Sequence, residues 1–353
     1  MNVPIEADEL LRLAVPLLSA AGFGAPVGLE SLPGGGNNRV YRLTGVGGVA
    51  LLKSYFRHPE DLRDRLGAEY RFSEYAWGLG VRSLPRPLAC DREHAVGLYE
   101  YIPGIKLAAG EVEAAHVREA GLFLAALNKN RLSAAASALP MASEACFSIE
   151  SHLECVDRRT ARLQQIDADS PGGRRAAALV KRLLPQWHRI REKVVSNARA
   201  AGSSTAAVLP QAERCLSPSD FGFHNAIEFA EASPGDRRLR FIDFEYAGWD
   251  DPAKTVCDFF CQPAVPVPRG YLEAFVEQVA DCVPDAAGFC RRVGILLPVY
   301  EVKWCCIMLN EFLPVGSRRR FFARSEEDSL QRQGMQLDKV EAAVSRLEKP
   351  SQA

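Results

Sequence analysis

Three oxygen-bearing side chains, Asp220, Asn225 and Asp243, have the spacing of a site for a hard cation and for proton transfer. The first two stand five residues apart in a segment broken by Gly222, and Asp243 follows the apolar run Leu239–Ile242. A hairpin between the two segments would bring the three side chains together. Mg²⁺ prefers a few carboxylate or amide oxygens together with substrate phosphates. The pattern therefore predicts phosphoryl transfer of the kinase type, with one base for a hydroxyl group and two groups that hold the metal.

A lysine upstream strengthens this prediction. In the strand predicted over Val49–Tyr55, Lys53 shares a face with apolar residues and therefore needs an anionic partner. We expect it to hold nucleotide phosphates. The helix predicted to begin near Pro59 places Glu69 close to its inward face, which makes Glu69 the expected partner of Lys53. Glu74 is the alternative, but it faces away from the apolar stripe.

Two backbone segments complete the expected nucleotide site. The predicted hairpin over residues 27–43 carries three successive glycines, Gly34, Gly35 and Gly36, whose backbone N–H groups can approach an anion closely. The segment matches neither the dinucleotide fingerprint nor the Walker A pattern. A second strand pair ends at Pro103 and Gly104, where we place the linker between two lobes, so that Tyr101 and Ile102 lie nearest the adenine ring.

Length and composition indicate a two-lobed globular enzyme. At 353 residues the chain exceeds the usual size of one core, and we expect a nucleotide-binding lobe over 1–102 and a catalytic, substrate-binding lobe over 103–353. Lys+Arg 43 against Asp+Glu 44 leaves a net charge of -1, which argues against a nucleic-acid binder or a membrane-attracted surface.

The termini and cysteines favour a cytoplasmic protein. Glu6, Asp8 and Glu9 stand where a signal peptide carries basic residues, and no stretch offers about 18 uninterrupted apolar residues. The ten cysteines are scattered without a C-x-x-C pair, which is typical of reduced, buried thiols.

Beyond the predicted linker the chain is mostly helical. Helices are expected over 108–128, 147–166, 173–200, 268–282, 286–313 and 318–347, with a further helix beginning at Pro252 and a small-residue linker over 133–140. The predicted class is therefore α+β: an antiparallel sheet with one main helix, followed by a larger helical lobe.

From about Leu29 to Phe260 the chain resembles the aminoglycoside phosphotransferase and choline kinase-like family, whose fold is similar to that of protein kinases. The resemblance implies that Gly34 to Gly36, Lys53 and Glu69 bind and align ATP. It also implies that Asp220 is the catalytic base, Asn225 a metal ligand and Asp243 the principal Mg²⁺ ligand. The family's G-D-P-x-x-D pattern looks like residues 251–258.

One departure from the family concerns the loop that carries the base. The family histidine two residues before the aspartate is Pro218 in this sequence, so the loop reads Ser-Pro-Ser-Asp. In the family this histidine supports the loop, so its replacement bears on loop bracing and not on the chemistry. His224, beside Asn225, is interpreted as a loop residue.

The acceptor is expected to be a small hydroxylated molecule, a sugar or aminoglycoside-like metabolite, ahead of an amino alcohol such as choline. Carboxylates suited to a polycationic acceptor are Glu245, Asp250, Glu301 and Glu311. Lys303 and Trp304 are polar breaks in an apolar helix and are further candidates for the acceptor pocket. The basic cluster over 317–324 is interpreted as a solvated helix start, with contact to an acidic sugar as the alternative.

Two other functions fit parts of the sequence. A nucleotide-binding pseudokinase with a regulatory or scaffolding role is suggested by Pro218, but Lys53, Asp220, Asn225 and Asp243 together favour an active kinase. A Ser/His hydrolase using Ser219 and His224 lacks a G-x-S-x-G elbow and an orienting partner.

Overall fold

The computed structural model describes residues 6–33, 38–57, 61, 63–200, 202, 204–230, 237–313 and 326–349. The chain divides into two compact units. The first comprises Met1–Ser143, Cys215–Asp250 and Ala264–Cys282, and the second comprises Glu144–Arg214, Asp251–Pro263 and Val283–Ala353. The predicted lobe boundary at residue 102 does not coincide with this division. The segment with Asp220, Asn225 and Asp243 groups with the N-terminal sheet.

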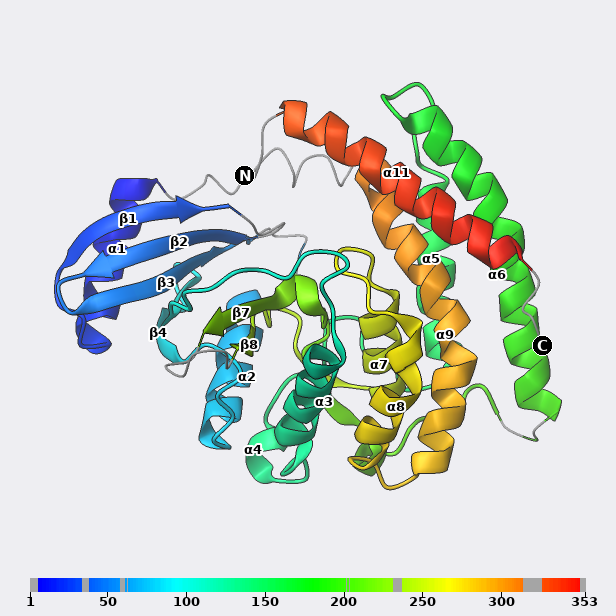
Figure 1. Ribbon diagram of the computed structural model, residues 1–353, viewed down its shortest axis with the longest axis horizontal. Coiled ribbons are helices and arrows are strands. Elements are labelled where there is room, and N and C mark those ends of the chain that lie inside the picture. Colours follow the sequence, from blue (N-terminus) through cyan, green and yellow to red (C-terminus); the bar gives the residue numbers. More distant parts are fainter. Residues whose placement is uncertain are drawn as a thin grey trace. The chain divides into compact units, whose positions relative to one another are not determined.

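The first unit contains a five-stranded antiparallel sheet (Figure 1). Its strands, in spatial order, are β1 (Pro26–Leu32), β2 (Asn38–Gly45), β3 (Gly48–Tyr55), β5 (Val96–Glu100) and β4 (Pro87–Asp91). The turn between β2 and β3 ends at Gly48, whose φ of +151° is one that L side chains rarely adopt. This tight turn places Lys53 opposite Val40 in the middle of the sheet.

Each face of the sheet is covered by one helix. Helix α1 (Ala7–Ala20) packs its buried residues on one face, against residues such as Leu43, Leu52 and Leu98. Helix α2 (Arg65–Gly78) packs on the other face, where Leu66 meets Tyr55 and Tyr99. Because side chains alternate along a strand, Lys53 points to the face that α2 covers.

Helix α2 begins later than the sequence predicts. The expected start near Pro59 is wrong: the helix begins at Arg65, and Asp64 is its N-cap. The Asp64 carboxylate accepts a hydrogen bond from the Gly67 amide at 2.8 Å. A side-chain cap of this kind satisfies a backbone N–H group that the first helical turn leaves free, so it determines where the helix begins.

The remainder of the first unit contains two short antiparallel strand pairs. Strands β6 (Cys215–Ser217) and β9 (Gly248–Asp250) form one pair, and β7 (Ala226–Ala230) and β8 (Arg237–Phe241) form the other. The helices are α3 (Ala114–Asn128), α4 (Ala134–Ser137) and α8 (Leu272–Ala280). Helix α4 lies inside the segment predicted as a linker, because Ser133 caps it with a hydrogen bond from the Ala136 amide.

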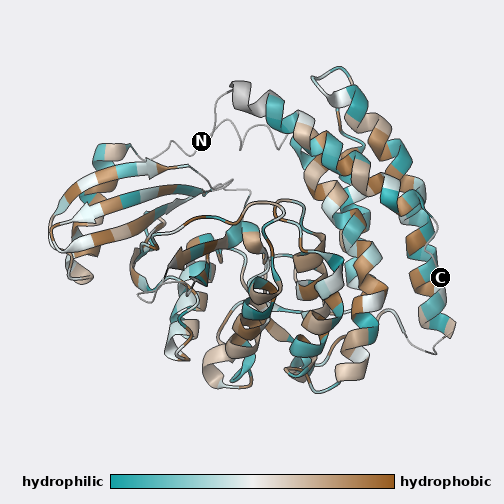
Figure 2. Cartoon of the chain, in the orientation of Figure 1, coloured by the Kyte–Doolittle hydropathy of each residue, from teal (hydrophilic) through white to brown (hydrophobic). Residues whose placement is uncertain are grey.

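The second unit is helical. It comprises α5 (Ile149–Leu163), α6 (Gly173–Ala200), α7 (Pro252–Cys261), α9 (Ala286–Leu309) and α11 (Glu326–Glu348). Helix α9 contacts all four of the others, which makes it the central helix of this unit. Figure 2 shows hydrophobic and hydrophilic residues side by side on α6 and α11, as amphipathic helices on a core require.

The predicted class, α+β with an antiparallel sheet, one main helix and a mostly helical remainder, is confirmed. Among the described residues, one helix, Ala286–Phe312, is long and apolar enough to cross a membrane, and 56% of its most apolar window is buried in the protein. The core helix of a folded domain has the same properties, so this helix is weak evidence for a span. The basic cluster over 317–324 lies outside the described residues.

Candidate active site

The first unit brings one lysine between two carboxylates. Lys53, with 4% of its surface exposed, places its Nζ 2.7 Å from Glu69 Oε1 and 3.0 Å from Asp243 Oδ1. Burial alone would lower the pKa of Lys53, but the negative charges of Asp243 and Glu69 outweigh burial and raise it. The ammonium group therefore stays charged, and it joins the centre of the sheet, helix α2 and the segment after β8.

Two tyrosines hold Glu69 in place. The Tyr55 hydroxyl donates to Glu69 Oε2 at 2.7 Å, and the hydroxyl groups of Tyr55 and Tyr99 lie 2.8 Å apart. Burial raises the pKa of Glu69, and the Lys53 charge offsets part of this effect. Both carboxylate oxygens of Glu69 thus have partners, so this residue orients Lys53 and has little capacity left for a ligand.

Asp243 differs from Glu69 in being accessible. Its side chain is 28% exposed, and its φ of +68° lies in the left-handed region that non-glycine residues seldom adopt. The next residue, Phe244, is buried, and its ring centroid lies 5.0 Å from that of Phe72 in α2. Packing of Phe244 holds the strained backbone in place, as is common at functional sites.

The loop after β6 presents Asp220. Ser219 has a φ of +67°, and its backbone N–H donates to the buried Ser217 hydroxyl at 3.0 Å. The Asp220 amide donates to the Pro218 carbonyl at 3.0 Å, and the Asp220 side chain is 36% exposed. The hydroxyl of Ser217 therefore braces this loop, in which Pro218 replaces the histidine of the family pattern.

Asn225 links the two segments of the site. Its Nδ2 donates to the Asp220 carbonyl at 3.0 Å and lies 3.4 Å from Asp220 Oδ2. Its backbone carbonyl accepts from the Ile242 amide at 2.8 Å, just before Asp243. The pairing of β7 with β8, in which Ala226 lies opposite Phe241, continues this contact. Asp220, Asn225 and Asp243 therefore converge, as the predicted hairpin requires.

His224 also contacts Asp220, which the sequence did not predict. Its Nε2 lies 3.3 Å from Asp220 Oδ1. Its Nδ1 is buried and has no hydrogen-bond partner within the part of the chain that the structure describes, which favours the tautomer with the hydrogen on Nε2. The Lys106 ammonium donates to the His224 carbonyl at 3.4 Å. The signal available in the sequence was the spacing of four residues inside a tight loop.

An aromatic cluster lies beneath both loops. Phe123 of α3 stacks on Phe241 with ring centroids 4.7 Å apart, and Phe221 lies 5.2 Å from Phe241. Phe244 belongs to the same group, 6.1 Å from Phe123. Each of the two aspartates, Asp220 and Asp243, is thus followed by a buried phenylalanine, which fixes both backbones against one helix.

Asn128 is a support that the sequence did not reveal. Its side-chain oxygen accepts from the Leu216 amide at 2.7 Å, and its Nδ2 donates to the carbonyls of Leu216 and Leu124 at 3.0 and 2.9 Å. These bonds attach β6, and with it the Asp220 loop, to the end of α3. The only signal was a polar residue at the end of an apolar helix.

The predicted linker is tied to the same region. Ile105 and Glu228 exchange backbone hydrogen bonds of 2.9 and 2.8 Å, which join the linker to β7. A Cβ atom on Gly104 would lie 2.4 Å from the Glu228 carbonyl oxygen, so only glycine fits there. Tyr101 is half-buried and Ile102 is buried, and both lie between β5 and the bridge of Ile105 with Glu228. Gly34, Gly35 and Gly36 lie outside the described residues.

The residues predicted for the acceptor have structural partners. Glu245 is buried and accepts from Asn38 Nδ2 at 2.8 Å, and Arg65 Nε lies 3.3 Å from its Oε2. This contact ties the first residue of β2 to the start of α2. Asp250 is fully buried in β9. Binding of an acceptor by Glu245 or Asp250 stays a prediction.

Lys303 and Trp304 belong to the second unit. Lys303 Nζ lies 2.9 Å from Asp258 Oδ1 and 3.0 Å from Oδ2, and Trp304 Nε1 donates to Oδ1 at 2.9 Å. Lys254 adds a further cation 3.6 Å from Asp258 Oδ2. All of these partners except Trp304 are buried. Their proposed role at the acceptor stays a prediction.

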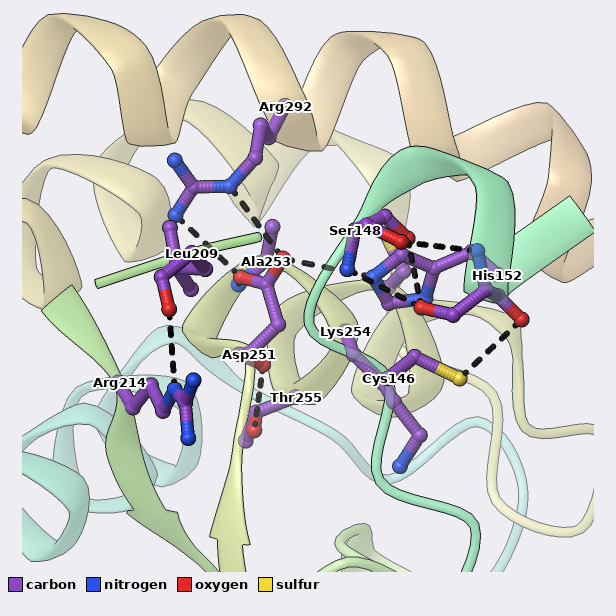
Figure 3. A network of polar contacts seen from close by, with 12 residues as sticks. Cys146, Ser148, His152, Leu209, Arg214, Asp251, Ala253, Lys254, Thr255 and Arg292 are labelled. Carbon is purple, nitrogen blue, oxygen red and sulfur yellow. Dashed lines mark hydrogen bonds and ion pairs between the residues drawn. The ribbon is translucent and has the colours of Figure 1, made fainter. Parts of the chain in front are cut away.

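In the second unit, the buried carboxylate of Asp251 caps the N-terminus of helix α7. Figure 3 shows His152 and Arg292 reaching Asp251 from two sides. His152 Nε2 lies 3.4 Å and Arg292 Nε 3.3 Å from Asp251 Oδ2, and the Ala253 amide donates to Oδ1 at 2.8 Å. Burial would raise the pKa of Asp251, but the His152 hydrogen bond and the Arg292 charge outweigh it and lower the pKa.

The donor set at the first site fits Mg²⁺. The partly exposed carboxylate of Asp243 and the amide oxygen of Asn225 are hard donors, and Asn225 uses its Nδ2 for Asp220, which leaves its carbonyl oxygen for a cation. The described residues contain no cluster of three or more His, Cys, Asp and Glu that could enclose a metal. An open set of this kind suits a metal that is shared with substrate phosphates.

Comparison with known proteins gave a family match. The model of a family described as the phosphotransferase enzyme family matches residues 28–281. No match was found among curated protein sequences.

Solved structures share the fold at low sequence identity. The spectinomycin phosphotransferase APH(9)-Ia, solved with ADP and spectinomycin, is 12% identical with a TM-score of 0.59 over 97% of this chain and 99% of that one. Choline kinase LicA from Streptococcus pneumoniae is 15% identical with a TM-score of 0.57 over 95% and 98%. Choline kinase from Cryptosporidium parvum Iowa II is 12% identical with a TM-score of 0.54 over 97% of both chains.

Proposed function

This chain belongs to the phosphotransferase enzyme family and is a small-molecule kinase, and from that premise we propose that it moves the γ-phosphate of ATP to a hydroxyl group of a sugar or sugar-containing metabolite. The observation that carries the proposal is the convergence of Lys53, Asp220, Asn225 and Asp243 within one compact unit. Positioned charges of this kind are the main means by which kinases act, because phosphoryl transfer needs little covalent chemistry from the protein.

Asp220 is the base in this proposal. Its carboxylate is 36% exposed and stands on a loop whose backbone is held by Ser217, Asn225 and Asn128. It accepts the proton of the acceptor hydroxyl as the oxygen attacks the γ-phosphorus. His224 supports Asp220 by donating to Oδ1, and so takes a supporting role that Pro218 cannot fill.

Lys53 and Glu69 form the nucleotide clamp. Lys53 contacts the phosphates of ATP while Glu69, held by Tyr55, keeps its ammonium in position. In this proposal the linker carbonyls and amides near Tyr101 and Ile102 bind the adenine edge, and Gly34, Gly35 and Gly36 bind the phosphates. The exposed backbone of a linker can read adenine without a charged side chain.

Asn225 and Asp243 would hold Mg²⁺, with Asp243 as the principal ligand. When bound, the metal neutralises negative charge on the β- and γ-phosphate oxygens. The strained backbone of Asp243, held by the buried Phe244, keeps the carboxylate aimed at the same place before any ligand arrives. Such preorganisation avoids reorganisation during the reaction.

The burial of two of the four predicted carboxylates supports a choice of acceptor. Glu245 and Asp250 are 4% and 0% exposed, and Glu245 is occupied by Asn38 and Arg65. A polycationic aminoglycoside needs accessible carboxylates, whereas a sugar is recognised largely through neutral hydrogen bonds. This supports a sugar or sugar-containing metabolite over a polycation. An amino alcohol such as choline is the alternative acceptor.

The test is a screen for ATP consumption over sugars, aminoglycosides, nucleosides and amino alcohols, with the Asp243→Ala protein as the blank. We expect turnover that requires Mg²⁺, and a phosphorylated product identified by mass spectrometry. Turnover confined to amino alcohols would replace the sugar assignment and leave the kinase assignment intact.

A matched binding measurement separates the kinase from a pseudokinase. Isothermal titration with ATP and Mg²⁺ should give saturable binding in the wild type and in Asp220→Ala, because Asp220 acts on the acceptor. Saturable ATP binding without turnover of any acceptor would favour the pseudokinase. Absence of both would contradict the whole assignment.

A further inference from the structure

The second unit contains a groove rich in basic side chains. It lies along helices α6, α9 and α11, is open to solvent and has a volume of about 460 Å³. Its basic lining residues are Arg189, Lys193, Arg291, Arg346 and Lys349. Glu301 is the one acidic residue of the lining. In a chain with a net charge of -1, five cations against one carboxylate is a strong local excess.

The floor of this basic groove is apolar. Ile190 and Val194 from α6 and Leu347 from α11 are buried there, and Ile295 and Pro298 of α9 complete the apolar surface. A volume of a few hundred Å³ with an apolar floor and a few polar groups is typical of small-molecule sites. The groove therefore offers contacts for an apolar body as well as for negative charge.

Outside the groove lining, cations of α6 form ion pairs with carboxylates of α11. Arg175 of α6 contacts Asp338 and Glu341 of α11, and Arg182 contacts Glu348, and none of these residues lines the groove. These cations of α6 meet carboxylates of α11 across the helix pair. At the groove this pattern stops, although the packing of the helices continues through Ile190 and Leu347.

One of the five cations has an internal role. Arg189 Nη2 donates to the Leu347 carbonyl at 2.7 Å and to Gln186 Oε1 at 2.9 Å, so it satisfies a carbonyl near the C-terminal end of α11. Lys193, Arg291, Arg346 and Lys349 form no ion pair with a carboxylate among the described residues. These four exposed cations beside one hollow create a local positive potential, which favours the binding of an anion there.

We propose that the basic groove is a binding site for a small anionic molecule that carries a phosphate or carboxylate group on a short apolar body. The cations contact the anionic group, and the floor formed by Ile190, Val194 and Leu347 takes the apolar part. All lining residues belong to the second unit, whereas Lys53, Asp220 and Asp243 belong to the first. The proposal is therefore independent of the kinase chemistry.

Isothermal titration with octyl phosphate, below its micelle concentration, tests the proposal on the full-length protein. Octyl glucoside has the same apolar chain without the charge, and pyrophosphate has charge without the chain. We expect saturable binding of octyl phosphate, weaker binding of pyrophosphate and none of octyl glucoside. Added salt should weaken the binding, because the contacts are between charges near the surface.

Two variants locate the binding. Lys193→Ala/Arg346→Ala should weaken octyl phosphate binding about tenfold or more, since it removes two charge-assisted contacts. The matched control Arg174→Ala/Lys181→Ala removes the same charge from exposed positions of α6 outside the groove and should leave binding unchanged. An equal loss in both variants would overturn the proposal, because it would show attraction by net charge.

Gly294 allows a steric test that removes no charge. This lining residue of α9 has no heavy atom within 4 Å of the position that a Cβ would take, so Gly294→Phe can place its ring in open space. We expect this variant to fold, as checked by circular dichroism, and to lose octyl phosphate binding. Unchanged binding in Gly294→Phe would place the anion elsewhere and overturn the proposal.

The two sources of such an anion are distinguished with vesicles. Phosphatidylcholine vesicles containing phosphatidylglycerol present the same phosphate chemistry on a membrane surface. Sedimentation of the protein with these vesicles, without binding of octyl phosphate in solution, would reject a small-molecule site. Binding of octyl phosphate without sedimentation is the expected result.

Discussion

Two Lys–Asp clusters in this protein contain the same kinds of charged group in opposite proportions. In the first unit, one ammonium, that of Lys53, is shared by Glu69 and Asp243. In the second unit, one carboxylate, that of Asp258, is shared by Lys303 and Lys254. The first cluster has an excess of negative charge, and the second has an excess of positive charge.

The clusters also differ in access. Asp243 is 28% exposed and has a strained backbone, whereas Asp258 is 3% exposed and both of its oxygens are bonded, one of them also by Trp304. An open carboxylate with spare lone pairs can take a cation, and a closed one only connects helices. Accessible, unsatisfied oxygen, more than charge, therefore distinguishes a candidate active site from a structural ion pair.

The largest expected effect is on the open cluster. Asp243→Ala and Asp220→Ala should each lower kcat on the order of a thousandfold, or about 4 kcal/mol of transition-state stabilisation, and the melting temperature of Asp220→Ala should change little. Steady-state kinetics and calorimetry measure the two quantities. Asp91→Ala is the control, since Asp91 pairs with His94 at an exposed turn and should keep full activity. Full activity in Asp220→Ala would remove the proposed base.

For the closed cluster around Asp258, we expect the main effect on stability instead of on kcat. Asp258→Ala removes the carboxylate that pairs with the buried Lys303 and Lys254, which we expect to lower the free energy of unfolding by about 3–5 kcal/mol. Chemical denaturation monitored by fluorescence measures this value. Asp258→Asn keeps the shape and part of the hydrogen bonding and should lose less. A wild-type free energy of unfolding in Asp258→Ala would show that this cluster does not stabilise the helices.

An intermediate effect is expected at the contact between His224 and Asp220. His224→Leu should lower kcat about tenfold through the lost hydrogen bond to Asp220 and leave the KM for ATP unchanged. His224→Gln retains an N–H donor and should recover most of the loss. If both variants lose activity equally, the histidine does not act by donating to Asp220.

The smallest effect concerns pH. Because the folded pKa of Asp251 is depressed, its ionised form stabilises the fold above the unfolded pKa of about 4, and this contribution is lost as the pH falls through the folded value. The melting temperature should therefore fall below about pH 4, by about 2–4 °C for each kcal/mol. Asp251→Asn should be less stable at neutral pH, and its melting temperature should fall less steeply as the pH is lowered below about 4. Parallel curves for the two proteins would assign the acid loss to other groups.

Several features were predictable because they depend on short stretches of sequence. The strand with Lys53 and the spacing of Asp220 and Asn225 follow from local patterns, and the α+β class follows from the order of strands and helices. The family resemblance added the chemistry. Localisation in the cytoplasm, Mg²⁺ and the identity of the acceptor stay predictions.

Other features needed the folded chain. Glu245 looked like an acceptor carboxylate, but Asn38, 207 residues earlier, and Arg65 enclose it. The bonds from Asn128 to Leu216 and the approach of His224 to Asp220 depend on loop geometry that periodicity does not encode. The groove between α6, α9 and α11 requires three helices to meet.

The sequence by itself therefore determined which chemical groups are present and in what local spacing, because backbone periodicity acts over a few residues. Only the tertiary structure decided which carboxylates stay open and which are closed by partners. That choice depends on burial and on hydrogen bonds between segments far apart in the chain, such as Lys53 with Asp243 and Lys303 with Asp258.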